Sequence, residues 1–188
     1  MDFFCYHRDR RGSLALRSEL LEQHWTYTDK FAKRMIARGP VFEEGEADGE
    51  EEQLLGSVHI VTFDEVAQAW AFACEEPGYQ AGAYRDVMLR RWRNDLGRTM
   101  WEFEGGRPDR DGYVVLGLGA PEPVTEPAVP EGLPGLIAYG PLLSDDGETW
   151  LGTAALLRAP SRDAARAVLD PERYAEIEVH SWEFGGRR

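Results

Sequence analysis

The two halves of the chain repeat one pattern of strands, turns and helices, and this repeat constrains the fold more than any other feature. The stretches "RGPVFEEGEADGEEEQLLGSVHIVTF" and "YGPLLSDDGETWLGTAALLRA" each contain Gly-Pro, an acidic turn, and Gly-Ser or Gly-Thr opening an apolar strand. An Ala-rich helix follows each stretch, and each half closes on a strand ending in Trp92 or Trp182. The separation between matched residues shrinks steadily from Gly39 and Gly140 to the two tryptophans. This steady change predicts an internal duplication trimmed by deletions.

Each half therefore has the order strand, helix, strand, strand, helix, strand. That order is the β-α-β-β-α-β plan of a ferredoxin-like α+β unit, an antiparallel sheet with two helices on one face. Two such units can close their open faces on each other within one chain, as a built-in pseudo-dimer. The expected domains are a first repeat at 1–103, a linker at 104–111 rich in Gly, Pro and charge, and a second repeat at 112–188.

The halves differ most where the first helix belongs. The first half has "GSLALRSELLEQHWTYTDKFAKRMIARG", whereas the second has "APEPVTEPAVPEGLPG" with five prolines. An interior proline costs a helix about 3 kcal/mol, so the second unit is predicted to lack its first helix. Two interpretations stay open: ordinary loop shortening, or the loss of one of two sites.

His24 lies within a predicted amphipathic helix over 19–31, "ELLEQHWTYTDKF". It shares one face with Leu20, Tyr27, Phe31 and Met35, which predicts that its imidazole points into the protein. A buried histidine satisfied by a hydrogen bond is one interpretation. The other is a general acid or base, because an imidazole titrates near neutral pH.

The remaining histidines and the cysteines give weaker signals. His7 is expected at the surface end of a strand, His59 on the strand face opposite to its neighbours, and His180 at a solvated position. Neither these residues nor Cys5 and Cys74 have the spacing of a zinc site. The acidic run at 43–52 lacks the pattern of an EF-hand and predicts a solvated loop. No cofactor and no metal is therefore expected.

Charge and hydropathy narrow the possible partners. A net charge of −13 argues against nucleic-acid binding, which depends on Lys and Arg, and against anionic membrane surfaces. The apolar run in the opening "MDFFCYHRDRR" is too short to form the core of a signal peptide. No apolar stretch of the sequence is long enough to span a membrane. We therefore expect a cytoplasmic protein with reduced thiols.

The first half resembles the YCII-related domains. The matching residues are "RD" at the end of the first strand, "GSLALR", the helix with His24, "RGP", "GS" and "EEPGYQAGAYRDV". The resemblance implies a dimeric α+β barrel, found in single-domain and tandem forms, with a recurring histidine and aspartate. One branch of the family resembles dehydrochlorinase-type enzymes, and most members have no assigned substrate.

Carried onto this chain, the resemblance implies three site residues. His24 matches the histidine, and Asp9 matches a recurrent acid at the end of the first strand. Glu76 stands where the family has aspartate before proline, which is a departure. The second half keeps that pair as Asp170-Pro171 and lacks the histidine, so it is expected to be degenerate.

The hypothesis that follows is a cofactor-free lyase or isomerase with His24 as general acid or base and Asp9 or Glu76 as its orienting partner. Its ligand would be a small cyclic hydroxylated or carbonyl compound, aromatic or lactone-like, in a cavity between the two sheets. One alternative is a non-catalytic small-molecule binding or sensing module. Another is a structural or interaction protein that uses the proline-rich strip 120–135. A monomeric pseudo-dimer and a homodimer both fit.

Overall fold

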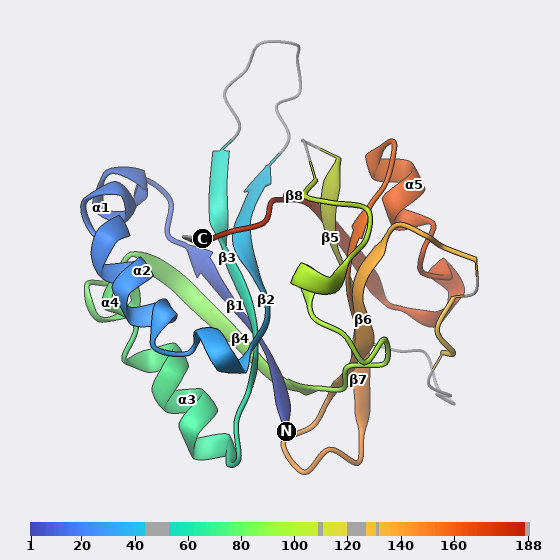
Figure 1. The fold of residues 1–188 in the computed structure, drawn as a ribbon, viewed down its shortest axis with the longest axis horizontal. Coiled ribbons are helices and arrows are strands. Elements are labelled where there is room, and N and C mark those ends of the chain that lie inside the picture. Colours follow the sequence, from blue (N-terminus) through green and yellow to red (C-terminus); the bar gives the residue numbers. More distant parts are fainter. Residues whose placement is uncertain (44–52, 109–110, 120–126, 131, 187–188) are drawn as a thin grey trace.

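The computed structural model describes residues 1–43, 53–108, 111–119, 127–130 and 132–186. Their strands form a closed barrel in which every neighbouring pair is antiparallel, and helices lie on its outside (Figure 1). The chain thus has an α+β fold, as predicted. The strands are β1 (Asp2–Asp9), β2 (Met35–Glu43), β3 (Gln53–Thr62), β4 (Tyr84–Trp92), β5 (Gly112–Leu118), β6 (Leu136–Leu143), β7 (Trp150–Arg158) and β8 (Glu176–Trp182). The α-helices are α1 (Leu14–Glu19), α2 (Leu21–Asp29), α3 (Val66–Cys74), α4 (Pro77–Gln80) and α5 (Arg162–Arg166), with 3-10 turns at Ala32–Arg34, Met100–Glu102 and Pro171–Arg173.

The two halves of the chain contribute strands to the barrel in the same relative order. It runs β4-β1-β3-β2 through the first half and β8-β5-β7-β6 through the second. The halves meet at two short seams, where β2 pairs with β8 and β4 pairs with β6.

A tryptophan and a glycine lie together at each seam. Trp182 pairs with Val41, and a Cβ on Gly39 would meet the Trp182 indole nitrogen at 2.7 Å. Trp92 pairs with Leu142 at the other seam, and a Cβ on Gly140 would meet its ring at 3.0 Å. Glycine is needed at both places because the facing strand and indole occupy the volume of a side chain.

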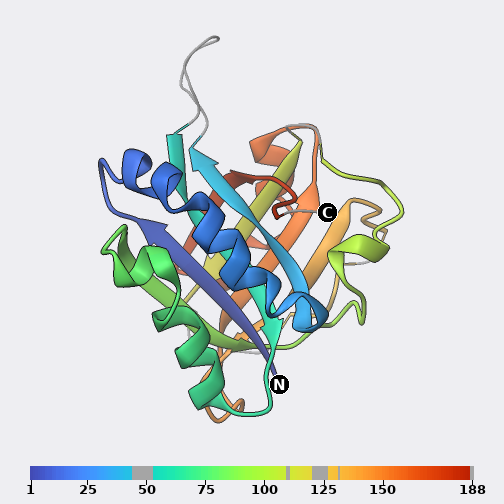
Figure 2. The same cartoon turned by 60° about the vertical axis from the view of Figure 1, so that its left-hand side comes forward.

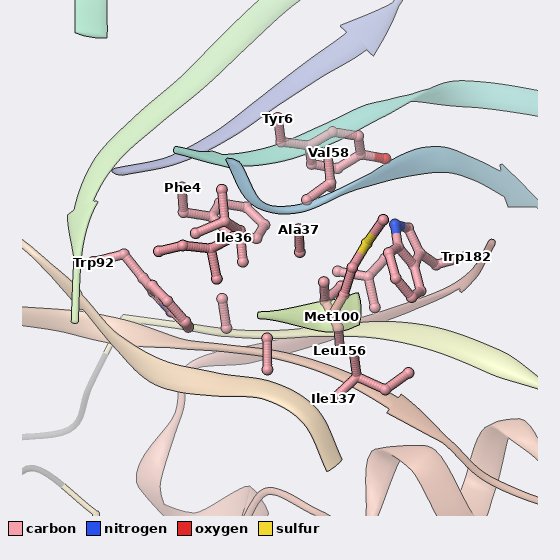
Figure 3. Packing of buried hydrophobic residues seen from close by; sticks show 14 of the residues in the cluster. Phe4, Tyr6, Ile36, Ala37, Val58, Trp92, Met100, Ile137, Leu156 and Trp182 are labelled. Atoms are coloured by element: carbon pink, nitrogen blue, oxygen red, sulfur yellow. The ribbon is translucent and has the colours of Figure 1, made fainter. Parts of the chain in front are cut away.

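The barrel interior is filled by apolar side chains. Phe4 and Ile36 lie between Trp92 and Trp182, and Met100 packs beside Trp182 (Figure 3). These side chains are at most 7% exposed, and burying each contributes about 1.5–3 kcal/mol. Here the aromatic residues expected to line a cavity between the two sheets pack against one another. A cavity of about 500 Å³ is nevertheless lined by Tyr6 and Arg8 of the first half and by Glu178 and His180 of the second.

Helices cover the outer face of the first half. Phe3 and Cys5 point outward from β1 and pack with Phe72 of α3 and Tyr27 of α2. Figure 2 shows α2 lying across the strands of this half. The second half has a separate outer cluster beside α5.

The helix predicted over 19–31 is divided and shorter than expected. Leu20 ends α1 and precedes α2, which stops at Asp29, while Met35 already belongs to β2. The apolar spacing from Leu20 to Met35 predicted one helical face, although Met35 belongs to a strand. Residues of both elements are buried, so their apolar residues give one continuous pattern. The described residues between β5 and β6 form no helix, and 120–126 and 131 lie outside the described part. The loop predicted at 43–52 lies outside it too, apart from Glu43.

Candidate functional site

Glu76 is positioned by a local sequence motif. It is the N-cap of α4, and Pro77 occupies the first helical position, where its missing N–H is not needed. The Glu76 Oε2 atom accepts a hydrogen bond from the Tyr79 backbone N–H at 2.8 Å. The side chain is completely buried, so this cap fixes a carboxylate inside the protein.

The other oxygen of Glu76 contacts His24. His24 Nδ1 lies 2.8 Å from Glu76 Oε1, and the imidazole is 13% exposed. A carboxylate accepts, so the contact requires a proton on Nδ1 and leaves Nε2 of the neutral ring as an acceptor. Burial raises the pKa of Glu76, but the hydrogen bond from His24, the positive charge of the protonated His24 ring and backbone N–H groups outweigh it and lower that pKa to about 2. The longer side chain therefore still reaches the imidazole.

Asp9, the other predicted partner of His24, contacts Arg17 instead. Arg17 Nη1 donates to Asp9 Oδ1 at 2.9 Å, and Nη2 donates to Ser57 Oγ at 2.8 Å. The guanidinium carbon lies 4.8 Å from the centre of the Tyr84 ring. Burial raises the pKa of Asp9 to about 6, although Arg17 opposes this shift. Asp9 thus holds a buried cation near the pair of His24 and Glu76.

His7 is not the surface group that the sequence predicted. It is fully buried, with Nε2 2.9 Å from the Ala73 carbonyl oxygen and Nδ1 3.7 Å from Cys5 Sγ. Burial lowers the pKa of His7 to about 4. The reason is topological, because β1 lies between β3 and β4 and α3 covers its outer face. The alternation of Phe3, Cys5 and His7 carried a usable signal, since all three share that face.

His59 lies beside His24, and its burial was not predicted from the sequence. It faces away from Val58 and Ile60, as predicted, but is 2% exposed. Its ring centre lies 5.5 Å from that of His24 and 6.0 Å from that of His7. Burial lowers its pKa well below the ordinary value, and nearby His24 adds to the shift. Its Nδ1 has no hydrogen-bond partner within the described part of the chain.

A cavity of about 380 Å³ adjoins these histidines. It lies on the outer face of the barrel, bounded by α1, α2, β2, β3 and the residues after β8. Its polar lining includes His24, His59, Arg17 and Arg38, and its apolar lining includes Trp25. The imidazole of His24 therefore faces an open cavity large enough for a small molecule.

The end of the second half completes this cavity. Phe184, Gly185 and Gly186 line it, and the Gly185 N–H donates to the Arg38 carbonyl at 3.0 Å. Arg38 is 6% exposed, and its Nη1 donates to Asp29 Oδ1 at 3.0 Å. Sequence reasoning missed this wall because nothing local links residues 184–186 to β2.

The last histidine, His180, is partly buried, with Nε2 3.5 Å from Glu178 Oε2. No group of His, Cys, Asp and Glu in the described ranges could hold a metal ion. Within the same ranges, no helix has both the length and the apolar character needed to cross a membrane.

Residues 1–93 match the family model of the YCII-related domain. Through this half, the chain belongs to the YCII-related family. No curated protein matches the chain.

Three of the similar solved structures illustrate the likeness. One is a 5-chloro-2-hydroxyhydroquinone dehydrochlorinase from Burkholderia phenoliruptrix AC1100 in complex with 2,5-dihydroxybenzoquinone, at 23% identity and a TM-score of 0.46, covering 52% of this chain and 99% of that one. Another is a putative monooxygenase from Lactobacillus acidophilus NCFM, at 6% identity and 0.48, covering 96% and 91%. The third is an anthrone oxidase-like protein, at 10% and 0.44, covering 98% and 90%. With TM-scores below 0.5, they add nothing to the fold seen in the strand order.

Proposed function

We propose that this protein is a cofactor-free lyase or isomerase that moves a proton on a small cyclic hydroxylated or carbonyl compound. One observation carries the proposal: His24 lines a cavity while a fully buried carboxylate holds its Nδ1. A carboxylate in this position fixes the tautomer of the imidazole and leaves Nε2 to exchange a proton with a ligand.

The residues around the cavity have distinct roles in this reaction. His24 Nε2 takes a proton from a carbon next to a carbonyl, and the electron pair of that C–H bond moves onto the carbonyl oxygen. Arg17 and Arg38 stabilise the resulting oxyanion. In an isomerisation, His24 returns the proton to another carbon. In an elimination, the electron pair expels a leaving group. Glu76 and Asp9 are positioning residues, which act through His24 and Arg17.

We also propose that the chain is a tandem repeat with one site. The repeats would be 1–103 and 112–188, joined by the linker 104–111, as two ferredoxin-like units in an intramolecular dimeric α+β barrel. The shared strand order and the two Trp–Gly seams support this proposal. In the second half, Asp170 caps a turn by accepting a hydrogen bond from the Glu172 N–H at 3.1 Å. The sequence match between the halves makes Ala155 the equivalent of His59. That half keeps the cap and lacks the imidazoles.

Hydrogen–deuterium exchange tests the proposed chemistry. A panel of cyclic ketones, lactones and hydroxylated aromatics is incubated with the protein in D₂O, and ¹H NMR follows the carbon-bound protons. We expect exchange to fall about 100-fold or more in His24→Gln, because general acid–base catalysis contributes that much. Gln23→Ala, at an exposed neighbouring position of α2, is the matched control and keeps the rate.

Two outcomes would contradict the proposal. Exchange at an unchanged rate in His24→Gln would show that the His24 imidazole does not move the proton. Compounds that bind the wild-type protein but exchange no proton with it would indicate the alternative, a binding or sensing module.

A further inference from the structure

We propose that the cavity beside His24 takes an organic anion, a single-ring compound whose carboxylate or acidic enol oxygen lies against Arg17 and Arg38. The inference rests on the proposed function, because it names the class of compound on which that site acts. It follows from the charges, the buried polar groups and the size of the cavity.

The cavity is basic although the chain is acidic. The ionisable residues lining it are Arg17, Arg38, His24 and His59, and no Asp or Glu belongs to the lining within the described part of the chain. The whole chain has 34 acidic residues and a net charge of −13. A lining with one sign of charge therefore does not reflect composition, and a cavity with cationic groups favours an anion.

Each of three cavity-lining side chains is held by a carboxylate that does not itself line the cavity. Asp9 contacts Arg17, Asp29 contacts Arg38 and Glu76 contacts His24, and none of the three acids lines the cavity. A guanidinium carries five N–H donors in a fixed plane, so a carboxylate on one side does not exhaust it. The acids orient the two arginines while the cavity side stays cationic.

His59 gives independent support for a ligand. It lines the cavity at 2% exposure, and its Nδ1 has no partner within the part of the chain that the structure describes. A buried polar group without a partner is unfavourable and calls for a specific reason, such as a bound molecule. His59 thus adds a second imidazole to the wall of the cavity, 5.5 Å from that of His24.

The volume and the apolar lining limit the rest of the molecule. About 380 Å³ lies at the lower end of small-molecule sites, which suits one ring with its substituents. Trp25, Phe42 and Leu54 provide apolar contacts for that ring. An anionic group on a flat ring satisfies both parts of the lining.

Matched acids and amides test the inference, because each pair has nearly the same shape and differs in charge. Benzoate, salicylate, 2-furoate and cyclohexene-1-carboxylate are titrated by calorimetry at low salt beside benzamide, salicylamide, 2-furamide and the cyclohexene amide. We expect at least one acid to bind about tenfold or more tightly than its amide, as for a hydrogen bond to a charged group.

Variants connect that preference to the cavity. Arg38→Gln removes the preference, whereas Arg38→Lys keeps part of it and shows that the site still folds. Arg34→Gln removes the same charge from an exposed position, where the side chain is 47% exposed, and leaves the preference unchanged. Amides that bind as tightly as the acids, no binding of any acid at millimolar concentration, or a full preference in Arg38→Gln would each overturn the inference.

This test fails independently of the proposed function. A preference for acids without any proton exchange would refute the proposed reaction and support an anion-binding site. Proton exchange on neutral compounds, with acids and amides bound equally, would support the reaction and refute the anionic substrate.

Discussion

Replacing Glu76 by Gln gives a test of how strongly the buried carboxylate is held. The pKa of Glu76 falls from 4.5 to about 2 in the folded protein. At about 1.4 kcal/mol per pKa unit, the charged form stabilises the fold by about 3 kcal/mol at pH 7. The side chain is fully buried, so solvent screening does not reduce this figure. Gln keeps an acceptor for the Tyr79 N–H but has no charge, so we expect Glu76→Gln to lose about 2–3 kcal/mol.

Urea denaturation at several pH values measures this effect. A folded-state pKa below the unfolded value gives stability that is present above pH 4.5 and lost as the pH falls toward 2. At pH 3.5, a substantial part of the wild-type advantage, about 1 kcal/mol or more, should be gone. Glu75→Gln removes the same charge from the exposed neighbouring residue and is the control. A difference between wild type and Glu76→Gln that is absent at pH 7, or unchanged at pH 3.5, would refute this reasoning.

Two further predictions concern buried polar and tightly packed positions. His7→Leu leaves the Ala73 carbonyl unpaired and should cost about 1–3 kcal/mol in urea denaturation. With a folded-state pKa of about 4, wild-type His7 should show no NMR titration between pH 7 and 5.5, and stability should fall from pH 6.5 toward 4; a titration near pH 6.5 would contradict its burial. Gly39→Ala and Gly140→Ala each place a Cβ on a backbone carbonyl at a seam and should cost about 3 kcal/mol, measured by thermal unfolding. Gly12→Ala meets no atom and should cost about 1 kcal/mol from its positive φ; equal losses at all three glycines would argue against the seams.

Much of the strand pattern could be predicted from the sequence. The alternation in "GSVHIVTF" predicted a strand at 56–63, and β3 spans Gln53–Thr62. The sequence match paired Gly39 with Gly140 and Trp92 with Trp182 as equivalent positions, but that Gly39 meets Trp182 and Gly140 meets Trp92 is known only from the structure. Glycine and tryptophan are distinctive residue types, so the equivalence of the two halves is easy to recognise at these positions.

The partner of His24 could be narrowed to two acids but no further. The Glu-Pro dipeptide is a local cap signal, so the place of Glu76 at a helix start is readable from the sequence. Whether it or Asp9 reaches the imidazole depends on how α2 lies over α4, which is a tertiary fact. Arg17, which donates a hydrogen bond to Asp9, could not be recognised as a site residue from the sequence. Arginine is common on exposed helix faces.

The position of the cavity could not be predicted. Large apolar side chains pack together in the barrel interior, and only the structure shows that the cavity beside His24 lies on the outer face instead. The wall formed by residues 184–186 comes from the other half of the chain, across a seam. The burial of His7 and His59 likewise depends on which helices cover the outer face.

The central claim is that Glu76 holds the proton of neutral His24 on Nδ1 and leaves Nε2 free to act in the cavity. The ¹⁵N chemical shifts of the His24 ring, recorded at a pH where the imidazole is neutral, test this claim directly. We expect the Nδ1–H form in the wild-type protein and a shift toward the Nε2–H form in Glu76→Gln. A wild-type ring with its proton on Nε2 would contradict it.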